Sequence, residues 1–385
     1  MDIEVQKYDT FDTMELDNDL IRGIYSYGFE QPSTIQQLAI VPMKLKNDIL
    51  AQAQSGTGKT GAFTIGSLSV VDPTRKAPQI IVICPTRELS QQIERVAEAI
   101  GCYMNIKVLS ATGGNPVRND IQLLKNGAQF IVGTPGRIFD LIRRGDLGLE
   151  HIKYLIFDEA DQLLEDLFAE QIKAILNNNF PKTTNLALFS ATMPQNILDI
   201  AEKYLNDPVR ILLPKDEVTL EGIKQYYVDI EREEWKLPVL LDLYQQITVN
   251  QALIYVNKRQ KAEWLVKQLS LHGFTLEYIH GDMEVHERKK RMEDFRSGST
   301  RVLISTDLLA RGIDVQQVSL VINYEMPVQR ENYVHRIGRS GRYGKKGVAI
   351  NLICGNEVES IKEIEEYYET IIEELPEDLS NLILS

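Results

Sequence analysis

The chain is poor in cysteine, and its three cysteines, Cys84, Cys102 and Cys354, are scattered along 385 residues. This spacing supports neither a disulfide framework nor a CxxC metal site. No apolar run approaches the ~18 residues that a membrane helix requires, and the first residues lack the basic and apolar regions of a signal peptide. We therefore expect a protein of a reducing intracellular compartment, the cytoplasm, with no membrane partner.

An excess of positive charge is also absent, because 42 Lys and Arg stand against 55 Asp and Glu, which gives a net charge of −13. Lys and Arg drive binding to nucleic-acid phosphates, so this balance alone argues against such a partner. The charge is uneven, however: residues 301–354 hold eight basic and four acidic side chains, whereas residues 357–385 hold one and ten. Charge alone leaves open both a local basic face and ordinary solvated surface.

Short apolar runs, each followed by a small or polar loop, recur in both halves of the chain. The first half has them at 49–53, 79–85, 106–111, 130–135, 154–161 and 186–192, and the second at 226–230, 252–257, 275–280, 301–306, 320–324 and 348–352. They are apolar on both faces, which is typical of strands buried in a parallel sheet. Helical periodicity separates them, for example over 88–100 and 262–273. The alternation predicts an α/β fold with two domains.

The strand pattern gives way to Pro, Gly and charged residues near 212–225. We expect an N-terminal domain over 1–213, a linker over 214–224 and a C-terminal domain over 225–385 that ends with an acidic amphipathic helix at 357–375. In open α/β sheets, ligands bind at the carboxyl ends of the strands. The loops predicted at those ends are rich in polar, charged or glycine residues, so we expect the ligand site there.

One of these loops has the sequence of a phosphate-binding loop. It lies between a predicted strand and a predicted helix and comprises Ser55, Gly56, Thr57, Gly58, Lys59 and Thr60. Glycines let backbone N–H groups turn toward phosphates at a helix N-terminus. Lys59 would reach the β- and γ-phosphates, and the Thr60 hydroxyl would ligate Mg²⁺. The first glycine of the usual pattern is Ala53 here.

Carboxylates follow the apolar run 154–157. Asp158 is placed to bind the metal through its water shell, and Glu159 to orient and deprotonate the attacking water. Closely spaced carboxylates also occur on ordinary solvated loops. The phosphate-binding loop earlier in the chain is what favours a catalytic role for them. Ser190 and Thr192 could hydrogen-bond Asp161 and link hydrolysis to another surface, although such residues also serve as turn caps.

Arginines gather around glycines in the second half, at Arg336, Arg339 and Arg342. Guanidinium groups bind phosphoryl oxygens and stabilise the charge that develops during transfer, so this cluster predicts arginine fingers that act when the two halves close. A basic solvated loop is the alternative. Three further motifs, PTR, GG and TPGR, supply hydroxyls, glycine N–H groups and arginines. These groups would bind a phosphate–sugar backbone without recognising the bases. The alternative is that the three motifs form ordinary turns.

Together these motifs resemble the DEAD-box family of RNA-dependent ATPases and helicases. The match runs from about Phe11 to the C-terminus through GFEQPSTIQ, SGTGKT, PTREL, GG, TPGR, DEAD, SAT, ARGID and HRIGRSGR. Within the family the chain looks most like the translation initiation factor 4A group, and an alanine at position 53 is usual there. The resemblance implies two tandem RecA-like domains with ATP and Mg²⁺ between them. It also implies a monomer that binds single-stranded RNA and short RNA duplexes, with a 4G-type scaffold protein as a partner.

The resemblance also assigns roles by matching position. Gln36 and Phe11 would bind the adenine, Gly312 and Asp314 the ribose and phosphate, and Arg339 and Arg342 would be the arginine fingers. RNA-backbone contacts are expected from Arg87, Gly114, Thr134, Gly136, Arg137, Arg288 and Thr306, and interdomain coupling from Asp161, Ser190, Thr192, His335 and Arg336. Val285 replaces a family glutamine and Glu325 a family aspartate, and both bear on the RNA grip.

Three functions remain open on the sequence. The first is an ATP-dependent RNA helicase of translation initiation. The second is an ATP-gated RNA clamp in an exon-junction-type assembly, which would place the protein in the nucleus and would use the same residues. Ser340 and Tyr343 resemble the exon-junction relative, whereas LLARGIDVQQVSLVINY resembles the initiation factor. The third, a DNA translocase, is disfavoured by the GFEQPSTIQ element.

Overall fold

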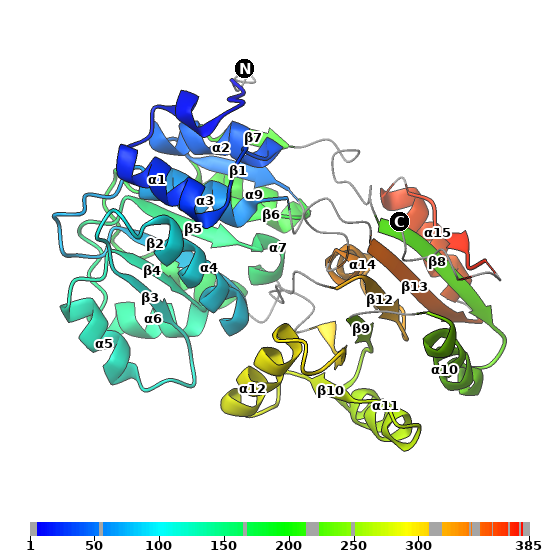
Figure 1. The fold of residues 1–385 in the computed structure, drawn as a ribbon. Helices are drawn as coiled ribbons and strands as arrows, with labels where there is room; N and C mark the ends of the chain where they lie inside the picture. The colour runs from blue at the N-terminus through cyan, green and yellow to red at the C-terminus, as the bar shows by residue number, and fades with distance from the viewer. Residues whose placement is uncertain are drawn as a thin grey trace. The chain divides into compact units, whose positions relative to one another are not determined.

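The chain forms two compact units, Met1–Pro214 and Lys215–Ser385, each built on a parallel sheet flanked by helices (Figure 1). The computed structural model describes residues 6–53, 57–164, 168–212, 223–247, 251–307, 318–338, 340, 347–355, 357–368, 370–376 and 379. Among these residues, no helix combines the length and apolarity needed to cross a membrane.

The first unit is built on a seven-stranded sheet in the order β3-β4-β2-β5-β6-β1-β7. Its strands are β1 (Ile49–Gln52), β2 (Ile80–Ile83), β3 (Val108–Ala111), β4 (Phe130–Gly133), β5 (Tyr154–Asp158), β6 (Asn185–Ser190) and β7 (Val209–Leu212). All six runs predicted for this half are strands. The edge strand β7 was not predicted, because it buries only alternate residues and so lacks the continuous apolar pattern of the central strands.

Helices cover both faces of this sheet. They are α1 (Asn18–Tyr27), α2 (Thr34–Lys44), α3 (Lys59–Leu68), α4 (Arg87–Ile100), α5 (Val117–Lys125), α6 (Pro135–Arg144), α7 (Ala160–Leu163), α8 (Ala169–Leu176) and α9 (Gln195–Tyr204), with a short 3-10 helix, η1 (Phe11–Met14), before them. Successive strand residues point to opposite faces. In β2, Ile80 and Val82 therefore join the core beneath α1–α4, while Ile81 and Ile83 join the core beneath α5–α9.

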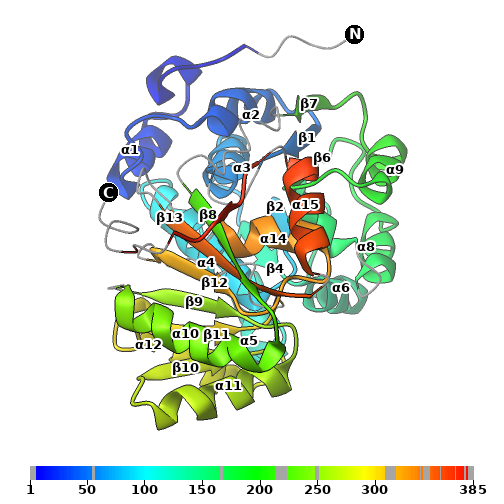
Figure 2. The same ribbon diagram turned by 90° about the vertical axis from the view of Figure 1, so that its right-hand side faces the viewer.

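The second unit repeats this plan with the strand order β10-β11-β9-β12-β13-β8-β14. Its strands are β8 (Ile223–Ile230), β9 (Ala252–Tyr255), β10 (Leu276–Ile279), β11 (Val302–Ser305), β12 (Leu320–Asn323), β13 (Gly347–Cys354) and β14 (Glu373–Glu374). Its helices are η3 (Glu233–Trp235), α10 (Lys236–Gln246), α11 (Arg259–Leu271), α12 (Val285–Arg296), α14 (Arg330–Ile337) and α15 (Glu357–Tyr368). The sheet packs against α10 and α11 in one hydrophobic core, and Figure 2 shows these two helices on one face of the sheet. A second core contains side chains of α12, α14 and α15.

The C-terminal helix is shorter than the sequence pattern indicates. The pattern predicts a helix over 357–375, but α15 ends at Tyr368, and Glu373 and Glu374 form β14 against Tyr226 and Tyr227 of β8. Pairing with β8 satisfies backbone groups that an edge strand would leave open, which local helical propensity does not anticipate.

Parallel pairing brings the candidate loops of each unit to one edge of its sheet. In the first unit Gln52 aligns with Ser190, and Ala111 aligns with Gly133. The loops that follow β1, β2, β3, β4, β5 and β6 therefore start at a common edge. This edge carries the motifs that the sequence singled out.

Candidate functional site

Lys59 is the first residue of α3, at the carboxyl edge of the first sheet. Gly58 precedes it with φ 99°, and a Cβ at Gly58 would lie 2.6 Å from Ser33 Oγ, so both conformation and space require glycine here. Lys59 is 6% exposed, and its Nζ has no hydrogen-bond partner among the described residues. A buried ammonium without a partner is costly, and an anion at a helix N-terminus would satisfy it. The site thus fits a phosphate group.

The rest of the phosphate loop is described only in part. Ser55 and Gly56 lie outside the described residues, whereas Thr57 and Gly58 are described, and Thr60 is half-buried in the first turn of α3. Thr60 and Lys59 therefore both lie in the first turn of α3.

Gln36 connects the start of α2 to this loop. Its side chain is 2% exposed; Oε1 accepts a hydrogen bond from the backbone N–H of Ser33 at 2.9 Å, and Nε2 donates to the carbonyl of Gly58 at 3.2 Å. The amide is thus held against the glycine that precedes Lys59. A group that binds Gln36 would act directly on the conformation of the phosphate loop.

Phe11 is completely buried, and its ring stacks on Phe29 with a centroid distance of 6.4 Å and an interplanar angle of 23°. It presents no surface to a base in this structure. Phe29 is only half-buried and packs at Gly61, where a Cβ would lie 2.9 Å from the Phe29 ring and 2.5 Å from Gln36 Nε2. Phe29 is therefore a partly exposed aromatic beside Gln36. Phe29 was not predicted as a site residue, although it lies within the GFEQPSTIQ element.

Asp158 and Glu159 lie at the end of β5, and both are almost fully buried, at 2% and 3% exposure. Glu159 has φ 53°, a left-handed conformation that is strained for a side chain of this size, and it leads into α7. Its Oε2 has no hydrogen-bond partner among the described residues. Burial raises the pKa of Asp158 to about 7, an effect that the Lys59 charge opposes and the Glu159 carboxylate increases. The Lys59 charge therefore acts on Asp158, whose carboxylate in turn feels that of Glu159.

The pKa of Asp158 predicts a pH-dependent stability. Its pKa is about 7 in the folded chain and about 3.9 in an unfolded one, so between these values the folded state binds more protons and loses stability as the pH rises. Asp158→Asn should therefore stabilise the first unit at pH 8 by roughly 2–4 kcal/mol, and by less at pH 5.5. Urea unfolding with a chelator and no nucleotide measures this, with Glu150→Gln, at an exposed carboxylate of the same unit, as control. A pH-independent difference, or a loss of stability, would contradict the burial argument.

The third carboxylate of this motif bonds to the loop that follows β6. Asp161 Oδ2 accepts a hydrogen bond from Thr192 Oγ1 at 2.9 Å, and the backbone N–H of Asp161 donates to Ser190 Oγ at 3.2 Å. These are the contacts that the sequence suggested between the two segments. They fix the start of α7 to the end of the neighbouring strand.

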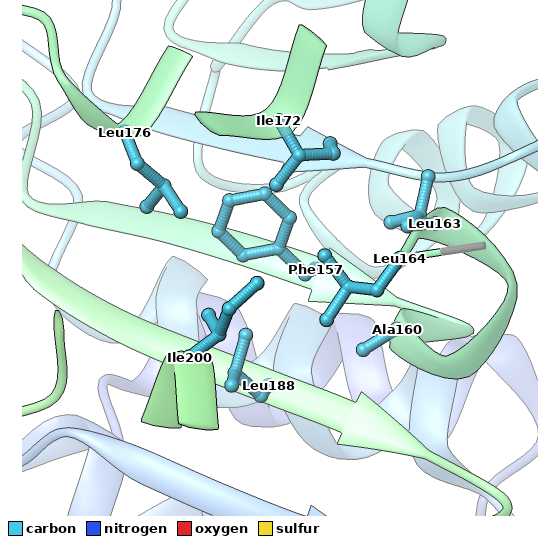
Figure 3. A pocket seen from close by; sticks show the side chains of 8 residues that line it. All are labelled: Phe157, Ala160, Leu163, Leu164, Ile172, Leu176, Leu188 and Ile200. Atoms are coloured by element: carbon cyan, nitrogen blue, oxygen red, sulfur yellow. The ribbon is translucent and has the colours of Figure 1, made fainter. Parts of the chain in front are cut away.

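An apolar pocket lies beneath α7 (Figure 3). Its eight lining side chains are all aliphatic or aromatic, among them Phe157, Ala160 and Ile200. A nucleotide needs polar partners, so this pocket is not its site. It belongs to the core that supports the Asp158–Asp161 segment from below.

The candidate RNA contacts of the first unit lie at the ends of β2, β3 and β4. Arg87 begins α4, and a Cβ on Gly113 would lie 3.2 Å from its guanidinium. Gly114 has φ 88°, which favours glycine. Thr134 precedes the first turn of α6, and a Cβ on Gly136 would meet only Gln171 Oε1, at 3.6 Å. Two helix N-termini and a glycine loop therefore share one edge.

Arg137, the remaining candidate of this edge, is turned into its own unit. Its guanidinium forms a buried ion pair with Asp120 of α5 and donates a second hydrogen bond, 2.7 Å long, to the carbonyl of Asn115. This pair was not predicted, because Asp120 lies outside every motif.

In the second unit, Arg336 of α14 is completely buried and extensively hydrogen-bonded. It donates to Asp307 Oδ2 at 2.9 Å, Asn257 Oδ1 at 2.7 Å and the carbonyl of Glu325 at 2.6 Å. Glu325 Oε2 accepts from the backbone N–H of Asn257 at 2.6 Å. Arg336 thus ties together the loops after β9, β11 and β12.

The other candidates of the second unit are described unevenly. Arg288 on α12 and His335 on α14 are buried, and Thr306 directly follows β11. The side chain of Val285 and the residues Gly312, Asp314, Arg339 and Arg342 lie outside the described residues.

Comparisons with known proteins give consistent matches. The model of the DEAD/DEAH box helicase family matches residues 33–200, and that of the helicase conserved C-terminal domain matches residues 235–344. A relative from Emericella nidulans, named ATP-dependent RNA helicase eIF4A, is 54% identical over 375 residues, which are 97% of this chain and 94% of the relative.

Solved structures resemble the chain over nearly its whole length. S. cerevisiae Dbp5 bound to RNA and ADP BeF3 has a TM-score of 0.89 and 36% identity, covering 98% of each chain. The DEAD-box helicase Mss116 bound to ssRNA and UDP-BeF has a TM-score of 0.86 and 25% identity, covering 99% of this chain and 83% of the other.

Proposed function

This chain belongs to the DEAD/DEAH box helicase family, and on that premise we propose that it couples RNA-stimulated ATP hydrolysis to a grip on single-stranded RNA and local duplex unwinding. It is an ATP-dependent RNA helicase and thus an ATP hydrolase. The observation that carries the proposal is the buried ammonium of Lys59 beside the buried carboxylates of Asp158 and Glu159.

The first unit would hold the nucleotide at α3. Lys59 and the backbone of residues 55–60 would bind the phosphates, with Gln36 and Phe29 on the side of the base and Phe11 packed behind Phe29. Mg²⁺ prefers oxygen ligands and usually combines one or two carboxylates with phosphates, so Thr60 and Asp158 suit it. When bound, Mg²⁺ would neutralise charge that develops on the phosphates.

Glu159 is the proposed general base. Its carboxylate is buried and, within the described residues, has one oxygen without a hydrogen-bond partner, so it is available to orient a water and take its proton. Asp161 would couple changes at the nucleotide site to the loop after β6, because Ser190 and Thr192 both form hydrogen bonds with it.

The second unit would complete the site. By matching position, we propose that Gly312 and Asp314 contact the ribose and phosphate, and that Arg339 and Arg342 stabilise the charge of the transferred phosphoryl group. His335 and Arg336 would couple the units, with Arg336 acting through the loops that it ties together. The units would close when ATP and RNA are both bound.

RNA would lie along the glycine and helix-terminus edge of the first unit. Arg87, Gly114, Thr134 and Gly136 supply a guanidinium and backbone N–H groups, which suit phosphates and carry no base readout. Arg288 and Thr306 would extend this contact in the second unit. The replacements at Val285 and Glu325 would tune that part of the grip.

We further propose a role in translation initiation in the cytoplasm, as a monomer that works with a 4G-type scaffold protein. The support is the high identity, over nearly the whole chain, to relatives named eIF4A. The clamp function would use the same site.

Steady-state ATP turnover with matched RNA and DNA oligomers tests the function. We expect RNA to stimulate turnover and DNA to fail, and RNA affinity to fall steeply with added salt because phosphate contacts dominate. Tight RNA binding with a non-hydrolysable ATP analogue but negligible turnover would instead favour the clamp. Equal stimulation by DNA would contradict the assignment to RNA.

A further inference from the structure

Asp120 and Arg137 form an ion pair inside the first unit, between α5 and α6. Their side chains are only 4% and 7% exposed. Two charges removed from water in this way rarely stabilise a fold more than an apolar pair of similar volume would. The pair therefore invites an explanation other than stability, such as control of local geometry.

The geometry that the pair controls is that of the loop 113–115. Arg137 uses one guanidinium nitrogen for Asp120 and another for the carbonyl of Asn115, at 2.7 Å. At the other end of the loop, Gly113 lies against the guanidinium of Arg87. The loop is thus held between arginines from two helices, with Gly114 in a left-handed conformation at its centre.

We propose that Asp120 is a positioning residue for RNA binding: through Arg137 it fixes the loop 113–115, so that Gly114 and Arg87 meet the RNA backbone in a set arrangement. Arg137 then acts on RNA through this loop and is not itself a ligand of phosphate. The inference rests on the proposed RNA-binding function and adds to it a residue outside every sequence motif.

Asp120→Asn separates positioning from direct contact, because the two roles predict opposite results. If Arg137 positions the loop, loss of the Asp120 charge loosens it, and the dissociation constant for a short single-stranded RNA should rise about tenfold, the cost of ordering one or two groups on binding. If Arg137 binds phosphate, its release from Asp120 would leave RNA affinity equal or higher. The matched control is Asp140→Asn, which removes the same charge from the exposed side of α6, where Asp140 pairs with Arg144.

The salt dependence of RNA binding gives an independent readout. Removing a phosphate ligand lowers the slope of log affinity against log salt by about one, whereas loosening a loop leaves the slope unchanged. We expect Arg137→Gln to weaken RNA binding with the wild-type slope, and Arg87→Gln to lower the slope. A slope lowered by about one in Arg137→Gln would overturn the proposal.

A double variant guards against a trivial folding defect, because Asp120→Asn leaves Arg137 buried without its charged partner. Asp120→Leu with Arg137→Met replaces the pair by apolar groups, which should preserve stability. We expect this variant to unfold like the wild type and still to bind RNA about tenfold more weakly, with the wild-type salt slope. Wild-type RNA affinity in this stable variant would show that the pair is merely structural and would overturn the proposal.

The wild-type full chain, assayed with the same RNA and a non-hydrolysable ATP analogue, separates this inference from the proposed function. If the wild type fails to bind RNA, the proposed function fails. If the wild type binds RNA and Asp120→Asn binds it equally well, only the positioning role fails.

Discussion

Glu159→Gln is expected to lower ATP turnover by about 10²–10⁴-fold, the usual contribution of a general base. Glutamine has nearly the same shape but cannot accept the proton of the attacking water. Nucleotide binding should persist, because the substitution keeps the shape of the buried side chain and removes a negative charge beside Asp158. RNA bound together with ATP should then dissociate more slowly, because turnover no longer releases it.

The measurements are steady-state turnover, nucleotide affinity and the RNA dissociation rate in the presence of ATP. Glu150→Gln is the matched control, since Glu150 is an exposed carboxylate of the same unit. Unchanged turnover in Glu159→Gln would refute the general-base role. A parallel loss of nucleotide binding would show that the substitution disturbs the site as a whole.

The fold was predictable because most of its strands are buried on both faces. Continuous apolar runs such as 80–83 and 130–133 have no other simple interpretation, and all of their residues are indeed buried. The pattern failed at two of the four sheet edges. It missed β7, which buries alternate residues, and it extended the last helix over β14, whose strand conformation depends on pairing with β8.

The loops of the candidate site were predictable for a related reason. Parallel strands place all their carboxyl ends at one edge, so Lys59, Asp158 and Thr192 had to lie near one another once the fold was known. Local sequence also anticipated the hydrogen bonds of Asp161, because Ser190 and Thr192 end the strand beside it.

Side-chain partners that depend on tertiary packing were not predictable. Arg137 was predicted to contact RNA and Arg336 to couple the domains, and nothing local showed that each is buried by partners from other elements. Phe11 was predicted to bind the adenine, but its ring is buried against Phe29. Phe29 is the partly exposed member of this pair. Such contacts join residues far apart in the chain and leave no local pattern.

RNA-stimulated ATP hydrolysis is expected to need groups from both units. Each unit has its own hydrophobic cores, so residues 1–214 should fold alone and retain the nucleotide-binding groups of α3. They lack Arg339 and Arg342, the proposed arginine fingers. Because such a finger contributes about 10³–10⁵-fold to turnover, the isolated first unit should lose nearly all RNA-stimulated hydrolysis.

A point variant of the full chain checks that this loss has the stated cause. Arg342→Ala should lower turnover by orders of magnitude with only a modest loss of nucleotide affinity, because the charge that it stabilises develops during transfer. Arg301→Ala, at an exposed position of the same unit, is the matched control. Wild-type turnover in Arg342→Ala would remove that residue from the mechanism.

The most direct measurement compares RNA-stimulated ATP turnover by residues 1–214 and by the full chain, at saturating nucleotide and RNA. If one nucleotide is bound by groups from both units, the full chain responds to RNA and the isolated unit does not. Equal RNA-stimulated turnover by the first unit alone would contradict the account.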